Sequence, residues 1–254
     1  LDGFSFCILN KDLKEITALY SFDYFENNLS LDNILKNIQQ IVLEEPLLRN
    51  KYQSVNITFK NKLNTFVPLE LFDEQFLSNY LQHTIKVFSN DFVAHDIIDK
   101  NKLVNVYIPF VNITNFFLDY FGPFNYKHAG TVLVEKLIDI NNDNTDIRVY
   151  VQVSKNDFEV IVLKQNELIL YNSFTLNTNE DFAYFILFIF EQLKLDRDVN
   201  KIVLLGDIDY QSDLYKLIYK YVRNVEFLDY DFPYQSEILN TVPKHQNFIV
   251  LNQF

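Results

Sequence analysis

Glycine is scarce in this chain: there are 4 among 254 residues, where average usage predicts about 18. Loops that hold phosphate groups depend on glycine, because the backbone must approach the ligand closely and often at positive φ. The scarcity of glycine therefore argues against a nucleotide-hydrolysing site before any motif is considered.

Basic residues are also few. Lys and Arg total 22 against 34 Asp and Glu, which gives a formal net charge of -12. Nucleic-acid phosphates and anionic membrane surfaces both attract basic faces, so we expect no nucleic-acid partner. No apolar run approaches the roughly 18 residues of a membrane-spanning helix, so we expect no membrane insertion.

Sulfur-containing residues are nearly absent. The single Cys7 cannot form an internal disulfide, which favours a reducing, cytoplasmic location; its apolar neighbours indicate a buried structural thiol. The chain begins with Leu1 and contains no Met, so we expect an N-terminal segment to precede it. No zinc-site spacing or nucleophile motif accompanies the histidines, so neither a metal site nor a catalytic residue is predicted. The four histidines are His83, His95, His128 and His245.

Aromatic residues are abundant, with 25 Phe and 16 Tyr, and the apolar pattern alternates between strand and helix periods. An α/β fold is therefore predicted. Strands are expected at residues 4–9, 15–22, 55–59, 64–68, 103–109, 124–127, 201–205 and 225–228, with three more strands within 147–174. The segments 55–59 and 64–68 are expected to pair. Helices are expected at 29–43, 73–88, 112–121, 129–138, 179–194 and 212–222.

The two halves of the chain resemble each other. Residues 4–22 and 158–174 each contain an apolar arm, a polar turn and a second arm that ends in an aromatic residue after a serine. Both halves then continue as helix, strand, helix, strand, which indicates two similar lobes, 1–143 and 144–254. The second half starts with an extra strand, so a matching strand is expected upstream of Leu1. The alternative is that any two β-hairpins look alike.

This element order resembles the actin-like ATPase superfamily, whose fold consists of duplicated ribonuclease-H-like lobes. The segments LDGFSFC at 1–7, FVPLELF at 66–72 and VYIPF at 106–110 resemble an uncharacterised bacterial family, a domain of unknown function with this fold. The likeness spans essentially the whole chain and implies no established activity.

The resemblance also implies where a nucleotide would bind. Members that hydrolyse ATP have an acidic residue at the end of each lobe's first strand, then a glycine-rich turn, and a later glycine pair beside the adenosine. Here Gln152 takes the acidic position, Ser154 the turn glycine, and Gly206-Asp207 the glycine pair. The resemblance therefore implies a degenerate nucleotide cleft, whose candidate cofactor-binding positions are Asp2, Gly3, Ser154, Lys155 and Gly206. Either the turn at 154–157 is a plain solvated turn, or it is a divergent ligand site in which Lys155 meets a phosphate.

Two segments are candidates for contact with another protein. Helix 179–194 is apolar nearly all round, so it either packs beneath a sheet or offers a docking face. The acidic and aromatic run at 227–234 is the stronger candidate. We expect a non-catalytic interaction or scaffold protein of the cytoplasm, with a protein partner and no cofactor. The alternative is a nucleotide-binding or phosphotransfer protein that uses ATP and Mg²⁺ in a divergent cleft.

Overall fold

The computed structural model describes residues 3–24, 30–83, 85–88, 90–142 and 145–254. The chain forms two compact units, here called the first and second units. The first unit consists of Leu1–Phe6, Tyr20–Leu133 and Asn252–Phe254, and the second of Cys7–Leu19 and Val134–Leu251. The predicted boundary between residues 143 and 144 lies outside the described residues. The predicted α/β class is confirmed.

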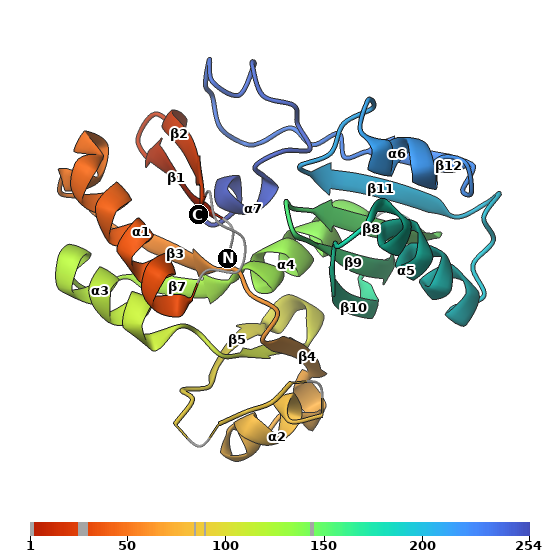
Figure 1. Cartoon of the computed structure of the whole chain (residues 1–254), viewed down its shortest axis with the longest axis horizontal. Helices are drawn as coiled ribbons and strands as arrows, with labels where there is room; N and C mark the ends of the chain where they lie inside the picture. Colours follow the sequence, from red (N-terminus) through yellow and green to blue (C-terminus); the bar gives the residue numbers. More distant parts are fainter. Residues whose placement is uncertain (1–2, 25–29, 84, 89, 143–144) are drawn as a thin grey trace. The chain divides into compact units, whose positions relative to one another are not determined.

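The second unit contains a five-stranded sheet, on the right in Figure 1. Its strands are β8 (Ile147–Val153), β9 (Asp157–Lys164), β10 (Glu167–Thr175), β11 (Lys201–Gly206) and β12 (Asn224–Phe227), in the order β10-β9-β8-β11-β12. The strands β8, β9 and β10 form an antiparallel meander, whereas β11 runs parallel to both β8 and β12. The three strands predicted within 147–174 are therefore confirmed.

Helices cover both faces of this sheet. Val149, Val151 and Val153 lie in a core with α5 (Asn179–Gln192) and α6 (Asp213–Ile218). Because side chains alternate along a strand, Tyr150 and Gln152 face the opposite side, where the Tyr150 hydroxyl donates to Asn141 Oδ1 at 3.0 Å at the end of α4 (Ala129–Asn141). Double-sided burial explains why β8 is apolar nearly throughout.

Helix α5 packs with one side only. It begins at a capping box in which Thr178 and Asp181 bond each other's backbone N–H, and Phe182 and Phe190 are fully buried. Tyr184 and Phe188, by contrast, are 61% and 46% exposed. The packing interpretation of this helix therefore holds for its inner face, while its outer face remains open to solvent.

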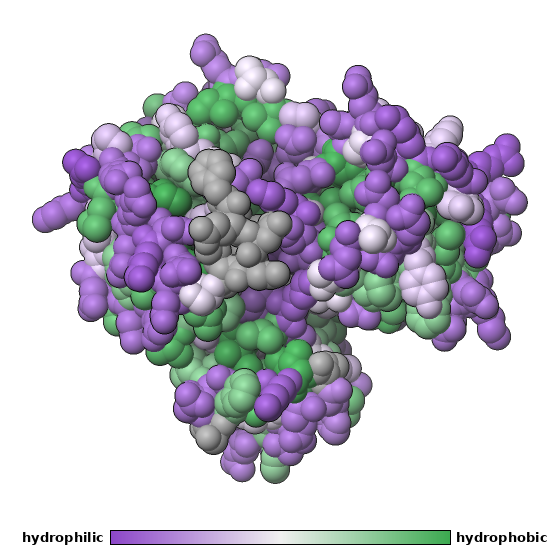
Figure 2. Space-filling view, in the orientation of Figure 1, coloured by the Kyte–Doolittle hydropathy of each residue, from purple (hydrophilic) through white to green (hydrophobic). Residues whose placement is uncertain are grey.

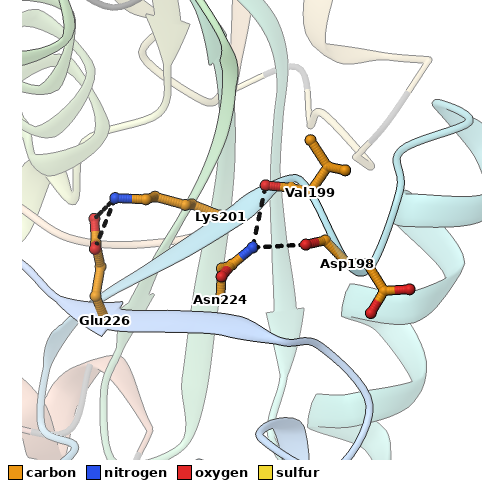
Figure 3. Close-up of polar contacts among 5 residues, drawn as sticks. All are labelled: Asp198, Val199, Lys201, Asn224 and Glu226. Atoms are coloured by element: carbon orange, nitrogen blue, oxygen red, sulfur yellow. Dashed lines mark hydrogen bonds and ion pairs between the residues drawn. The ribbon is translucent and has the colours of Figure 1, made fainter.

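Side chains fix the register where β11 and β12 begin (Figure 3). Lys201 Nζ lies 2.9 Å from a carboxylate oxygen of Glu226. Asn224 Nδ2 donates to the carbonyls of Asp198 and Val199, at 2.9 and 3.2 Å. These bonds hold the parallel pair with Lys201 opposite Asn224.

The first unit is built around short sheets. The predicted hairpin is present as β1 (Gly3–Asn10) and β2 (Glu15–Asp23), whose Cys7–Leu19 portion belongs to the second unit. Helix α1 (Leu31–Glu44) is capped by Ser30, and α3 is Val111–Phe121. The parallel pair of this unit is β3 (Asn56–Phe59) with β7 (Asn125–His128).

The predicted pairing of 55–59 with 64–68 is wrong. Strand β4 (Asn64–Pro68) pairs instead with β6 (Leu103–Tyr107), which also pairs with β5 (Ala94–Ile98). The connection is a local turn at Asn61, whose Oδ1 accepts from Leu63 N at 2.8 Å while its Nδ2 donates to Ile108 O at 2.9 Å. This turn directs the chain toward β6 and away from β3.

The β4-β6-β5 sheet and helix α2 (Leu77–Leu81) form a separate layer with its own apolar core. This layer lies between β3 and α3 in the chain, so it interrupts the predicted repeat of elements. The predicted helix 73–88 is wrong: it reduces to α2 and a 3₁₀ turn at Glu74–Phe76, and Phe76 and Phe88 are exposed. Figure 2 shows apolar residues gathered on this layer, in the lower part of the view.

The remaining elements are short. They are 3₁₀ turns at Pro46–Arg49, Leu69–Leu71 and Asp99–Asn101, and α7 at Phe248–Leu251. Within the described part of the chain, no helix has the length and apolar character that crossing a membrane requires.

Candidate functional site

Four predicted positions meet at one edge of the second unit's sheet. Strands β8 and β11 run parallel with Gly206 opposite Val153, and the turn that contains Ser154 and Lys155 follows β8 directly. Gln152, Ser154, Lys155 and Gly206 therefore lie at the same end of the two strands. Gly3 begins β1 in the first unit, and Asp2 lies outside the described residues.

The turn at 154–157 is closed by main-chain hydrogen bonds. Ser154 N donates to Asp157 O at 2.9 Å, and Asn156 O accepts from Leu176 N at 2.9 Å. Lys155 is exposed and forms no ion pair with any residue that the structure describes. Its ammonium group is the one basic charge in this turn.

Gln152 turns inward at the position of the expected metal-binding acid. The residue is 7% exposed, and its Nε2 donates to Val153 O at 3.1 Å. Its Oε1 is buried and has no hydrogen-bond partner among the described residues. Glu159 is buried directly opposite on β9, so its carboxyl shares the face of the sheet with the Gln152 amide.

Gly206 makes the closest backbone approach at this edge. Its φ is +91°, a conformation that favours glycine. A Cβ there would lie 2.1 Å from Val153 O and 2.3 Å from Gln152 Nε2, and Asp207 N donates to Val153 O at 2.9 Å. The missing side chain of Gly206 thus allows β8 and the end of β11 to pack together.

A histidine holds the other side of Gly206. Gly206 N donates to His245 O at 2.8 Å, while the ring Nε2 of His245 lies 2.8 Å from Ile208 O. Because a carbonyl only accepts, that nitrogen carries the proton. Burial lowers the pKa of His245, and its ring packs on Phe227 at 4.6 Å between centroids. These contacts suit a neutral structural histidine.

The residues present do not fit a magnesium–nucleotide complex well. Mg²⁺ is bound through carboxylates and phosphates, whereas Gln152 supplies a neutral amide. No group of three or more His, Cys, Asp and Glu side chains among the described residues could hold a metal ion. Around the turn, one Lys155 ammonium is outnumbered by the carboxyl groups of Asp157, Glu159 and Asp207, which would repel a polyphosphate if ionised. The arrangement offers hydrogen-bonding groups but too little positive charge to balance the phosphates of a nucleotide.

A buried polar network in the first unit is centred on Asp96. The sequence does not predict it. Asp96 Oδ2 accepts from the Thr131 hydroxyl at 2.6 Å and from His128 N at 2.8 Å, and Oδ1 accepts from the Tyr107 hydroxyl at 3.0 Å. Asn105 Nδ2 donates to the Thr131 hydroxyl at 2.9 Å. The network ties β5 and β6 to the junction of β7 and α4.

The electrostatics of this network follow from its burial. Burial raises the pKa of Asp96, against the opposing effect of its hydrogen bonds. Burial also lowers the pKa of His128 to about 3, so its ring is neutral, with Nδ1 accepting from Gly130 N at 3.0 Å and Nε2 bonding Asn61 O at 3.2 Å. The sequence signal for this network is Asn105, a polar residue within the apolar strand 103–107.

The side chains of the run at 227–234 point in two directions. Tyr230 and Phe232 pack against Phe248, with ring centroids 5.6 and 6.4 Å away. Asp229 and Asp231 point outward, where Lys244 Nζ lies 2.7 Å from an oxygen of each. The exposed surface of this run is therefore acidic, and its aromatic side chains largely support the second unit.

Solved structures define the class of fold. A Bacteroides thetaiotaomicron VPI-5482 protein, described as having an actin-like ATPase fold and unknown function, superposes with a TM-score of 0.81 at 24% identity, over 89% of this chain and 87% of that one. A chain of the PilM–PilN type IV pilus biogenesis complex superposes with a TM-score of 0.62 at 12% identity, over 98% and 93% of the two chains. The protein therefore has an actin-like ATPase fold, as the element order predicts.

The family follows from the sequence itself. Residues 1–225 match the family described as "Protein of unknown function (DUF3822)". The chain belongs to this family, which confirms the predicted resemblance to a domain of unknown function. No curated protein matches the chain.

Proposed function

We propose that this protein is a non-catalytic, protein-binding member of the actin-like fold that acts in the cytoplasm. The observation that carries the proposal is the packing at the end of β8: Gly206 lies so close to Val153 and Gln152 that a Cβ would stand 2.1 Å from a backbone oxygen. In this arrangement the glycine serves strand packing, and Gln152 hydrogen-bonds its own strand. Neither residue is then committed to a ligand.

A protein-binding role is supported by the fold's known uses. One of its structural relatives belongs to the PilM–PilN complex, so an actin-like framework can serve in an assembly of proteins. The excess of acidic over basic residues favours association with a basic partner and disfavours polyphosphate ligands. The single cysteine is consistent with a reducing compartment.

A second candidate function has its own supporting observation. Lys155 is exposed at the turn, and Gln152, three residues earlier, has a buried Oε1 without a partner among the described residues. A ligand with an N–H or O–H group could donate to that acceptor while its phosphate pairs with the ammonium group. A nucleotide-binding or phosphotransfer protein with a divergent cleft would use these two groups.

Calorimetry and thermal shift against ATP, ADP and GTP with Mg²⁺ test both candidates. The non-catalytic proposal expects no saturable heat and no change in melting temperature. A nucleotide at 100 times its Kd would stabilise the protein by about 2.7 kcal/mol, a rise of roughly 5–10 °C for a chain of this size. Such a rise, lost in Lys155→Ala and retained in the exposed control Lys220→Ala, would refute the proposal and establish the alternative.

A further inference from the structure

A groove of about 670 Å³ lies along helix α1 in the first unit. One wall is the end of β2, with Phe22 and Tyr24. The other wall is the face of α1 that carries Asn33, Asn37 and Gln40. The groove is separate from the turn at 154–157, and none of its residues figures in the site described above.

The groove is long enough for several residues of an extended chain. Its α1 wall runs from Asn33 to Glu44, a rise of about 17 Å at 1.5 Å per residue. An extended peptide covers that length with about five residues. A wall that follows three turns of a helix fits a linear segment better than a compact small molecule.

The polar lining of the groove matches a peptide backbone. Asn33, Asn37 and Gln40 share one face of α1 because they lie at positions i, i+4 and i+7. An amide side chain has both a donor group and an acceptor, so it can bond the N–H and C=O groups of an extended main chain. Within the described residues, the side chains of Asn33 and Asn37 have no hydrogen-bond partner, whereas Gln40 Nε2 donates to Glu44 Oε1 at 3.2 Å.

The charge of the groove selects a basic segment. Asp23, Glu44 and Glu45 contribute three carboxyl groups to the lining, against the single ammonium of Lys36. The last turn of α1 contains no basic residue. Arg49 already donates to the carbonyl of Leu43 at 2.6 Å, so a cation at this end would be recognised by the exposed Glu44 side chain rather than by helix carbonyls.

We propose that this groove binds an extended segment of a partner protein through its backbone, with a Lys or Arg of that segment beside Glu44. This inference rests on the proposed protein-binding function and adds the location of the site and the chemistry of its partner. The amides hold the main chain, and the carboxylates select the positive side chain.

An array of synthetic heptapeptides tests this proposal on the full chain. Each peptide has a Ser, Thr and Val background with one Lys or Arg, and a matched set has Glu at the same position. We expect the basic set to bind at least about tenfold more tightly than the acidic set. Fluorescence polarisation with the tightest peptide should then show about a tenfold weakening in Glu44→Lys and a smaller loss in Asn37→Ala.

The controls separate a site effect from a general charge effect. Glu191→Lys makes the same charge change at an exposed position on α5 and should leave the affinity unchanged. Glu44→Gln, a milder change, should give an intermediate loss, with an unaltered circular dichroism spectrum for every variant. Absence of binding by any basic peptide, equal binding of the acidic set, or an equal loss in Glu191→Lys would each overturn the groove proposal.

The groove proposal can fail while the proposed function stands, and the proposed function can fail while the groove proposal stands. Saturable, Lys155-dependent nucleotide binding would overturn the non-catalytic function whatever the peptides do. Failure of the peptide array with no nucleotide binding would remove the groove alone and leave protein binding at another surface.

Discussion

Replacing Gly206 by alanine tests the packing on which the proposed function depends. A non-glycine residue at positive φ costs about 1–2 kcal/mol, and Gly206 has a φ of +91°. The new Cβ would also overlap Val153 O, 2.1 Å away, and overpacking of this kind costs about 1–3 kcal/mol. The sum is about 3 kcal/mol, which lowers the melting temperature of a chain of this size by roughly 6–12 °C.

Gly122→Ala is the matched control. Gly122 also has a positive φ, +77°, but a Cβ there would meet no atom within 4 Å. Only backbone strain should apply there, and at the ψ of -157° that Gly122 also has it costs about 1–3 kcal/mol. Urea unfolding measures both variants, and amide exchange in β8 and β11 shows whether the Gly206→Ala loss is local.

One result of this comparison would contradict the packing argument. If Gly206→Ala costs no more than Gly122→Ala, the contact with Val153 does not constrain this edge, and the glycine is free to serve a ligand. Adding Gln152→Ala to Gly206→Ala relieves the overlap with Nε2 but leaves the overlap with the carbonyl. The double variant should therefore regain only part of the lost stability.

Two further predictions concern burial. His128 has a pKa of about 3 in the folded protein and about 6.5 when unfolded, so below pH 6.5 the unfolded state binds a proton that the folded state does not. This linkage lowers the free energy of unfolding by about 2 kcal/mol between pH 7 and pH 5. The variant His128→Asn should lose this pH dependence, and urea unfolding midpoints at the two pH values measure it. A pH dependence that is unchanged in the variant would contradict the conclusion that His128 is neutral in the folded protein. On α5, Phe182→Ala should lower the free energy of unfolding by about 3–5 kcal/mol, and Phe188→Ala by less than about 1 kcal/mol, as measured by urea unfolding. Equal losses of stability would show that the helix is oriented differently.

Much of the second unit could be predicted from sequence because its elements are local and regular. The meander β8-β9-β10 joins consecutive strands by short turns, and α5 begins at a capping box that a short sequence window contains. The run at 202–205 is apolar throughout, as a strand buried on both faces requires. In these segments, local pattern and tertiary packing agree.

The first unit was harder to predict because its contacts are remote in the chain. The segment 55–59 pairs with residues 125–128, and nothing in either segment identifies the other. Strand β5 contains His95 and Asp96, which interrupt its apolar pattern, because Asp96 serves the buried network at Thr131. Because Asp96 makes a tertiary hydrogen bond, this segment lacks the apolar pattern from which a strand is predicted.

The side-chain arrangement at the candidate site could not be predicted from the sequence. The resemblance to actin-like ATPases implied the positions of Gln152, Ser154 and Gly206, and the parallel register of β8 and β11 places them at the same end of the sheet. The inward turn of Gln152 depends on the carbonyl of Val153 and on the shape of its surroundings, which no sequence pattern records. The groove along α1 similarly needs the end of β2 as its second wall.

Electrostatics connects the two proposals. Acidic groups gather near the turn at 154–157 and also line the groove along α1, so the charge that disfavours a triphosphate at one place favours a basic peptide at the other. Varying the salt concentration tests both proposals, since exposed charges are screened over about 10 Å at 0.1 M ionic strength. Peptide association should slow steeply as salt is raised, whereas any nucleotide affinity limited by repulsion at the turn should improve. Opposite salt responses of the two ligands would then have one physical cause, because screening weakens attraction and repulsion alike.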